Sequence, residues 1–170
     1  MGTEIERKFL LTSDAWRGAV SRSRRMVQGY LIAASVVTTG ASKSSVRVRV
    51  SGDEAWLNIK SSTLGVERTE YEYAIPLVDG DAMLARLCDG VVEKIRHYVA
   101  SGDHEYEIDE FFGANDGLVV AEIELGAVDE AFERPAWLGR EVSHLPRYYN
   151  LNLIGRPYSD WTAAEREGSD

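Results

Sequence analysis

Hydrophobic and polar residues alternate with a period of two through most of the chain, a pattern typical of β-strands. Short Gly, Ser, Asp and Asn turns separate the alternating runs, and two Ser-Gly-Asp triplets are brief enough to indicate hairpins. We predict strands near residues 3–11, 24–34, 44–51, 54–61, 67–76, 91–100, 103–112 and 118–126. The pattern predicts a mainly β, α+β fold in a single domain over residues 1–170.

Short helices are expected between and after the strands. Ser13 is expected to cap one of them, and residues 81–87, rich in Ala, Leu and Arg, predict a second. From residue 129 onward the strand period is lost and three prolines divide the chain. We therefore expect a helical C-terminal segment over about 129–166.

Charged residues recur at i, i+2 spacing, which places both members of a pair on one face of a strand. The pairs are Glu4/Glu6 followed by Lys8, Arg47/Arg49, Glu70/Glu72, Lys94/Arg96, Glu107/Asp109 and Glu122/Glu124. One interpretation is a solvated face. Solvated faces usually mix charges, however, whereas most of these pairs match in sign. Same-sign pairs favour a site with one wall for cations and another for a polyanion.

The opposite faces of the same strands are apolar, and if the charged faces point inward they form a polar interior. We therefore predict an eight-stranded antiparallel closed β-barrel, whose interior has room for one small ligand, with the few helices packed outside. The apolar outer faces then need cover, and a homodimer is one way to provide it.

The amino-acid composition limits the classes of binding partner that we expect. The net charge of −9 disfavours nucleic acid, and the longest apolar stretch, residues 30–37, is too short to span a membrane. The N-terminus shows no signal-peptide pattern, and Cys88 stands alone, so no internal disulfide is expected. These features favour the cytoplasm.

The run Glu4-Ile5-Glu6-Arg7-Lys8 resembles the Glu-x-Glu-x-Lys signature of the CYTH superfamily, also called triphosphate tunnel metalloenzymes. The resemblance covers about residues 3–150. Further matching motifs follow in the family's order, namely Val46–Arg49, Leu57–Lys60, Glu70–Tyr73, Val92–Arg96, Tyr106–Phe111 and Ala121–Leu125. Two other motifs, Gln28–Leu31 and Arg147–Asn150, look most like compact bacterial members, many of which act on inorganic triphosphate. One departure is His144-Leu145-Pro146, where a Gly and an acidic residue are expected.

The resemblance implies roles for individual residues. Glu4, Glu6, Glu122 and Glu124 are the implied metal ligands, with Asp109 and Glu72 as further contributors, and Mg²⁺ or Mn²⁺ is the implied cofactor. The implied phosphate-binding residues are Arg47, Arg49, Lys60, Lys94 and Arg96. Lys8 and Lys94 are candidates for polarising the attacking water or the leaving phosphate, and Tyr30 for assisting.

The leading hypothesis is a phosphoanhydride hydrolase that converts inorganic triphosphate to pyrophosphate and phosphate with a divalent metal. Rival enzyme functions are class IV adenylyl cyclase and thiamine or nucleoside triphosphatase. A non-catalytic polyphosphate-binding module and a purely structural β-domain are the alternatives outside catalysis.

Overall fold

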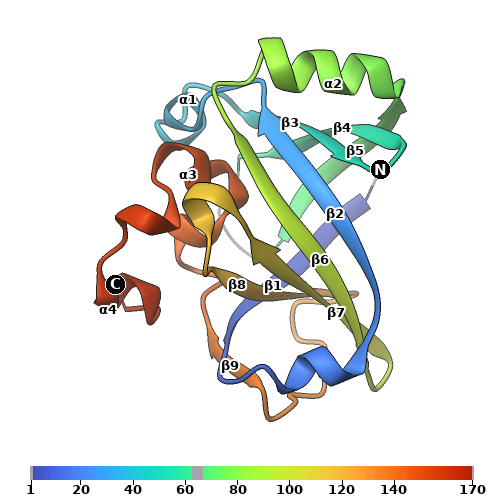
Figure 1. Ribbon diagram of the computed structural model, residues 1–170, viewed down its shortest axis with the longest axis vertical. Helices are drawn as coiled ribbons and strands as arrows, with labels where there is room; N and C mark the ends of the chain where they lie inside the picture. Colours follow the sequence, from blue (N-terminus) through green and yellow to red (C-terminus); the bar gives the residue numbers. More distant parts are fainter. Residues whose placement is uncertain (1, 63–66, 170) are drawn as a thin grey trace.

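The computed structural model describes residues 2–62 and 67–169, and strands dominate that part of the chain (Figure 1). The strands are β1 (Gly2–Leu11), β2 (Val20–Tyr30), β3 (Ser44–Ser51), β4 (Glu54–Ser61), β5 (Glu67–Ile75), β6 (Val91–Ser101), β7 (His104–Phe111), β8 (Val119–Leu125) and β9 (Leu138–Glu141). The α-helices are α1 (Ala34–Thr38), α2 (Leu77–Arg86), α3 (Asn150–Gly155) and α4 (Ala163–Arg166). Single 3-10 turns are η1 (Ala15–Ala19), η2 (Gly113–Asn115), η3 (Pro146–Tyr148) and η4 (Tyr158–Asp160). The predicted mainly β, α+β class is confirmed.

The strands form one antiparallel sheet in the order β5-β4-β3-β2-β6-β7-β8-β1-β9. This sheet curls until β1 also meets β5, with Gly2–Ile5 opposite Glu67–Glu70. Since β8 pairs along Ile5–Phe9, the other edge of β1 is shared between β5 and β9.

The prediction of a closed eight-stranded barrel is therefore wrong in two respects. The described residues form nine strands, and the ends of the sheet meet only along the start of β1 instead of closing a barrel along a whole strand. The cause is β9, which takes the far end of the β1 edge at Phe9 and Leu11. Four residues are too short to show an alternating pattern, so the sequence did not reveal this strand.

Other expected boundaries also need correction. Residues 129–166 are not a continuous helical segment, because β9 and irregular chain precede the short helices at the end. Ser13 caps no helix, since η1 follows Asp14 and shows no side-chain cap. The helix expected over 81–87 begins earlier, at Leu77, directly after Pro76, whose fixed backbone suits a helix start.

A hydrophobic core covers the outer face of β1, β7 and β8. Its buried members include Ile5, Phe9, Ile108 and Ile123 from these strands, with Trp137 from the segment before β9. The ring of Tyr106 contacts Trp137 edge-on, with centroids 5.1 Å apart. The apolar faces of these strands thus point outward into a core, which leaves their charged faces for the inside of the curl.

A second apolar cluster joins the C-terminal segment to one end of the sheet. It contains Val92, Phe111, Leu118, Val120, Val142, Leu145, Tyr148, Leu153 and Trp161. Tyr148 contacts Trp161 edge-on at 4.9 Å between ring centroids. This packing fixes η3 and α3 against the sheet, beside the charged interior.

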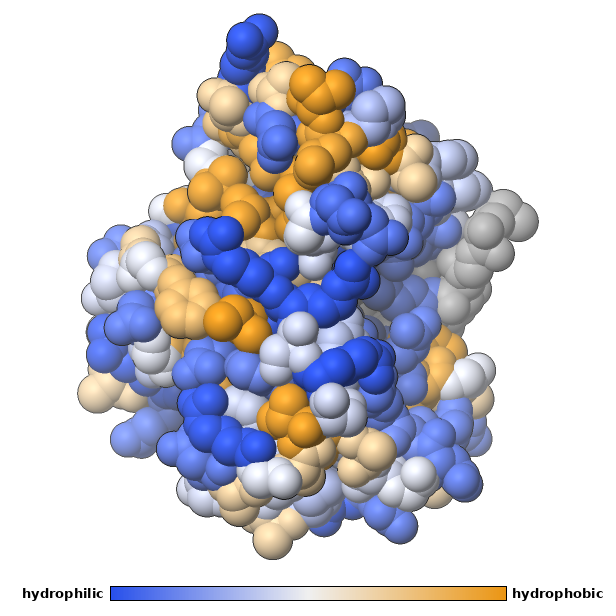
Figure 2. Space-filling view, turned by 45° about the vertical axis from the view of Figure 1, so that its right-hand side comes forward, coloured by the Kyte–Doolittle hydropathy of each residue, from blue (hydrophilic) through white to orange (hydrophobic). Residues whose placement is uncertain are grey.

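Helix α2 covers the outer face of β3 and β4 (Figure 1). The helix lies so close to β4 that a Cβ on Gly80 would meet the Ala55 Cβ at 2.7 Å, so only glycine fits there. Apolar side chains gather toward this upper end of the molecule (Figure 2), where Val78 and Leu87 are exposed. Within the described ranges, no helix has the length and apolar character needed to cross a membrane.

Candidate active site

The curled sheet encloses a cavity of about 810 Å³. Because alternate residues of a strand face the same side, the charged i, i+2 pairs arrive together on its walls. The predicted site residues that line it are Glu4, Glu6, Lys8, Tyr30, Arg47, Arg49, Lys60, Glu72, Lys94, Arg96, Glu122 and Glu124. The structure thus brings together every predicted site residue except Asp109.

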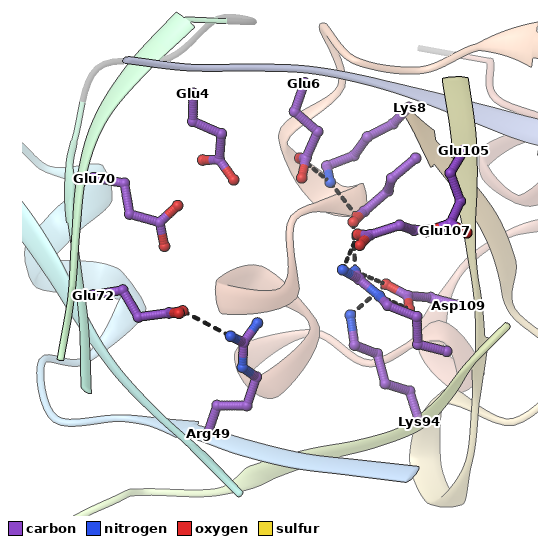
Figure 3. Close-up of polar contacts among 12 residues, drawn as sticks. Glu4, Glu6, Lys8, Arg49, Glu70, Glu72, Lys94, Glu105, Glu107 and Asp109 are labelled. Atoms are coloured by element: carbon purple, nitrogen blue, oxygen red, sulfur yellow. Dashed lines mark hydrogen bonds and ion pairs between the residues drawn. The ribbon is translucent and has the colours of Figure 1, made fainter. Parts of the chain in front are cut away.

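One side of the cavity is a buried network that we call the deep cluster, formed by Lys8, Lys94, Arg96, Asp109 and Glu122 (Figure 3). Arg96 donates to both oxygens of Asp109 at 2.7 Å and to Glu122 at 2.7 Å. Lys8 donates to Glu122 and Lys94 to Asp109. Opposite charges therefore alternate through the network.

Asp109 has a different position from the one expected of a metal ligand. Its side chain is fully buried behind the cavity wall, and both carboxylate oxygens accept hydrogen bonds from Arg96. Lys94 adds a further bond to the same group. In this arrangement Asp109 holds two cations in place and does not reach the cavity.

Burial and neighbouring charges shift the protonation of the deep cluster. Burial, reinforced by the charge of Arg96, lowers the pKa of Lys94 to about 8, although Asp109 opposes the change. Burial also disfavours the ionised form of Glu122. The charges of Lys8 and Arg96 outweigh that penalty and hold the pKa of Glu122 well below its usual range. Glu122 is therefore an ionised acceptor at neutral pH.

The opposite side, which we call the β3–β5 wall, consists of Arg47, Arg49, Asn58, Lys60, Glu70 and Glu72. Arg49 donates to Glu72 at 2.7 Å. Burial and then the charge of Arg47 lower the pKa of Arg49. Arg47 and Arg49 therefore repel each other, and Glu70 and Glu72 on the same wall offset part of that repulsion.

Glu4 and Lys60 connect the β3–β5 wall to β1. Lys60 Nζ lies 2.6 Å from Glu4 Oε2 and 3.3 Å from Glu70 Oε2. In Figure 3 the carboxylates of Glu4 and Glu70 point toward the same part of the cavity, where Lys60 Nζ contacts both. The lysine thus occupies the position between carboxylates where a cation is most favourable.

The acidic residues fit a divalent cation. Burial, followed by the charges of Glu4, Glu6 and Glu70, raises the pKa of Glu124, because these carboxylates repel one another. A bound cation relieves that repulsion, and carboxylate oxygens are the ligands that Mg²⁺ and Mn²⁺ prefer. In the part of the chain that is described, no three acidic groups already converge into a finished metal site.

Tyr30 and the C-terminal segment complete the lining. Tyr30 lies directly opposite Arg47 in the β2–β3 ladder. Pro146 and Tyr149 also line the cavity, and Lys8 Nζ lies 5.7 Å from the centre of the Tyr149 ring. The atypical His144-Leu145-Pro146 run therefore contributes Pro146 to the cavity, whereas Leu145 packs in the second core cluster.

Three lining or wall residues were not assigned a role from the sequence. Glu70 and Glu107 line the cavity, and Asn58 lies buried between charged residues of the β3–β5 wall. All three share the strand phase of assigned residues, namely Glu72, Asp109 and Lys60. Their positions in the alternating strand pattern could therefore have identified all three as facing the cavity.

Comparisons with known proteins agree with this geometry. The CYTH domain family model matches residues 2–153. An inorganic triphosphatase from Acetivibrio thermocellus is 40% identical over 162 residues, which cover 95% of this chain and 99% of the relative. An inorganic triphosphatase from Nitrosomonas europaea is 34% identical over 156 residues, covering 89% and 96% respectively.

Solved structures give the same result for the fold. The crystal structure of an inorganic triphosphatase is 31% identical, with a TM-score of 0.63, and the alignment covers 91% of this chain and 95% of the other. A Hippeastrum protein with a dominant triphosphatase activity has a TM-score of 0.58 at 17% identity, covering 75% of this chain and 80% of the other. At that identity, the second likeness supports the fold alone.

Proposed function

This chain belongs to the CYTH domain family, and from that premise we propose that it hydrolyses inorganic triphosphate to pyrophosphate and phosphate. The observation that carries the proposal is one cavity whose lining combines several cations with several carboxylates, which pair with one another across it. A linear triphosphate is small, strongly anionic and needs both kinds of group. The reaction forms a bond between a water oxygen and a terminal phosphorus and breaks the phosphoanhydride bond to the pyrophosphate.

The acidic residues are proposed to hold the metal. Glu4, Glu6, Glu122 and Glu124 line the cavity and supply hard oxygen ligands for Mg²⁺ or Mn²⁺, with Glu72 as a further contributor. When bound, such a cation neutralises phosphate charge and lowers the pKa of coordinated water. Asp109 is left out of this set because it does not line the cavity and its oxygens face Lys94 and Arg96.

The basic residues are proposed to bind the phosphates. The cations available are Arg47, Arg49, Lys60, Lys94 and Arg96. Phosphoryl transfer depends mainly on positioning and on stabilising charge, so fixed cations provide much of the catalysis. Lys94, held by Asp109, and Lys8, held by Glu122, are the best placed to stabilise the leaving phosphate or polarise the water. Tyr30 is the candidate for assisting through its hydroxyl group.

A second candidate is hydrolysis of an organic triphosphate. Val37 from α1 and Pro146 and Leu151 from the C-terminal segment give part of the cavity rim an apolar lining. An apolar rim can accommodate a base or another organic group attached to the triphosphate. Adenylyl cyclase chemistry is separable from hydrolysis because it releases pyrophosphate and leaves no orthophosphate.

The test is phosphate release from tripolyphosphate, ATP and thiamine triphosphate with Mg²⁺ or Mn²⁺. We expect the fastest turnover with tripolyphosphate, and its loss with a chelator and with Glu6→Ala. Turnover of an organic triphosphate alone would move the function to the second candidate. Binding of all three without turnover would indicate a polyphosphate-binding module.

The expected homodimer and cytoplasmic location stay predictions. Light scattering coupled to size-exclusion chromatography measures the first. A mass of one chain, 18.9 kDa, at micromolar concentration would contradict the homodimer.

A further inference from the structure

Asn58 is a neutral residue in the middle of the charged β3–β5 wall, and its side chain is fully buried. Its register partners on the two neighbouring strands are Arg47 and Glu72. Partners across an antiparallel ladder share a face of the sheet, so the amide lies on the side of these charged groups.

The amide of Asn58 bridges two carboxylates. Its Nδ2 donates to Glu70 Oε1 at 2.9 Å and to Glu72 Oε2 at 2.5 Å. One NH₂ group has two hydrogens, so it satisfies both acceptors. Since the two glutamates are like charges on one face of β5, the bridge offsets their repulsion and fixes their separation.

Each bridged carboxylate in turn holds a cation of the proposed phosphate site. Glu72 accepts a hydrogen bond from Arg49 at 2.7 Å. Glu70 lies 3.3 Å from Lys60 Nζ and 3.8 Å from the Arg47 guanidinium. The positions of three cations on β3 and β4 therefore depend on two carboxylates that share one amide.

We propose that Asn58 is a positioning residue that sets the spacing of the phosphate-binding cations. The inference rests on the proposed function, because it assigns these cations to the triphosphate. The role needs both the shape and the two donors of an amide. Leucine has a similar shape without donors, and aspartate adds a third negative charge beside Glu70 and Glu72.

Gln28 provides a matched control. It is also fully buried, and its register partner Arg49 places it on the cavity side of β2. Unlike Asn58, its amide makes no hydrogen bond to any described residue. Gln28→Met therefore removes a buried amide of the same kind without breaking a bridge.

The experiment compares wild type, Asn58→Leu, Asn58→Asp and Gln28→Met. Affinity for tripolyphosphate is measured by calorimetry in a chelator, where no metal-dependent turnover interferes, and KM and kcat are measured with Mg²⁺. We expect Asn58→Leu to weaken binding and to raise KM about tenfold, with kcat within about threefold. Misplaced phosphate-binding groups weaken the ground state and the transition state equally, and such a loss appears in KM. Asn58→Asp should lose more, and Gln28→Met should stay within about twofold of wild type.

Several results would overturn the proposal. Unchanged affinity in a folded Asn58→Leu protein excludes the bridge as a positioning device, and an equal loss in Gln28→Met shows that any buried amide has the same effect. If Asn58→Leu does not fold, Asn58→Ser keeps one donor, and wild-type affinity in that variant refutes the two-donor argument. If the wild type binds tripolyphosphate without hydrolysing it, the proposed reaction is refuted. The affinity measurements still test the role of Asn58 in that case. A wild type that neither binds tripolyphosphate in the chelator nor turns it over with Mg²⁺ refutes the positioning role as well.

Discussion

The deep cluster and the β3–β5 wall contain the same kinds of charged group and differ in burial. In the deep cluster, Lys94 is 1% exposed and Asp109 is 0% exposed. On the wall, the side chain of Lys60 is 12% exposed and that of Glu72 is 42% exposed. The comparison teaches that burial decides whether an ion pair mainly stabilises the fold or can exchange its partner for a ligand.

The physical reason lies in desolvation. A charge in the deep cluster that loses its partner stays buried without compensation, which is strongly unfavourable. The Glu72 carboxylate on the wall still meets solvent, so exchanging its partner for another changes the free energy less. The deep cluster is thus suited to fixed catalytic cations, and the wall to groups that exchange carboxylates for phosphates.

Asp109→Ala should have the largest effect on stability, because it leaves Lys94 and Arg96 buried together without their carboxylate. We expect the free energy of unfolding to fall by about 3–5 kcal/mol, measured by urea denaturation. Glu72→Gln on the wall keeps a side-chain oxygen to accept from Asn58 and is the control, with a loss below about 1 kcal/mol. Equal losses in the two variants would remove the distinction between the regions.

Substitutions in the two regions should also have different effects on kcat and KM. Lys94→Met removes a fixed cation of the deep cluster and should lower kcat about 10²- to 10³-fold. Lys60→Met removes an exchangeable cation of the wall and should mainly raise KM, about tenfold. Steady-state phosphate release measures both, and the opposite split would reverse the assignment of chemistry and binding.

The pH dependence should sharpen the comparison, because the low pKa of Lys94, about 8, results first from burial. Below that pH the ammonium is charged and can bind phosphate, and above it the charge is lost. We expect kcat/KM, which reports the free enzyme, to fall as pH rises through about 8, by about tenfold per unit. Lys94→Arg, which keeps its charge, should lose this decline. Retention of the decline would assign it to another group.

The smallest effect is expected outside the cavity. Arg25 and Glu93 form an exposed pair on the outer face, at 2.6 Å and with side chains 65% and 40% exposed. Arg25→Ala should change the free energy of unfolding by less than about 0.5 kcal/mol, again measured in urea. A loss comparable to that of Asp109→Ala would show that burial does not govern these pairs.

The sequence predicted which side chains face the cavity because strand phase is a local property. Glu4, Glu6 and Lys8 share a face whatever their partners are, and the same holds for each charged pair. The fold class followed from the same period. Both predictions needed only neighbouring residues.

What the sequence did not reveal depends on contacts between distant residues. The buried position of Asp109 results from Lys94 and Arg96 on the next strand, and β9 is defined by its pairing with β1, more than a hundred residues earlier. The sequence assigned Asn58 no role, since its bridge requires the register between β4 and β5. Register is set by the whole sheet and cannot be read from one strand.

The shared edges of β1 also have a consequence for synthesis. Residues 5–9 pair with residues 121–125, and Phe9 pairs with Glu141, so β1 finds two of its partners only after more than a hundred further residues have been made. Such non-local pairing makes folding slow and leaves the early strand exposed meanwhile. Because Glu4, Glu6 and Lys8 lie on that strand, the cavity wall that they form needs β8, more than a hundred residues later, to be held in place.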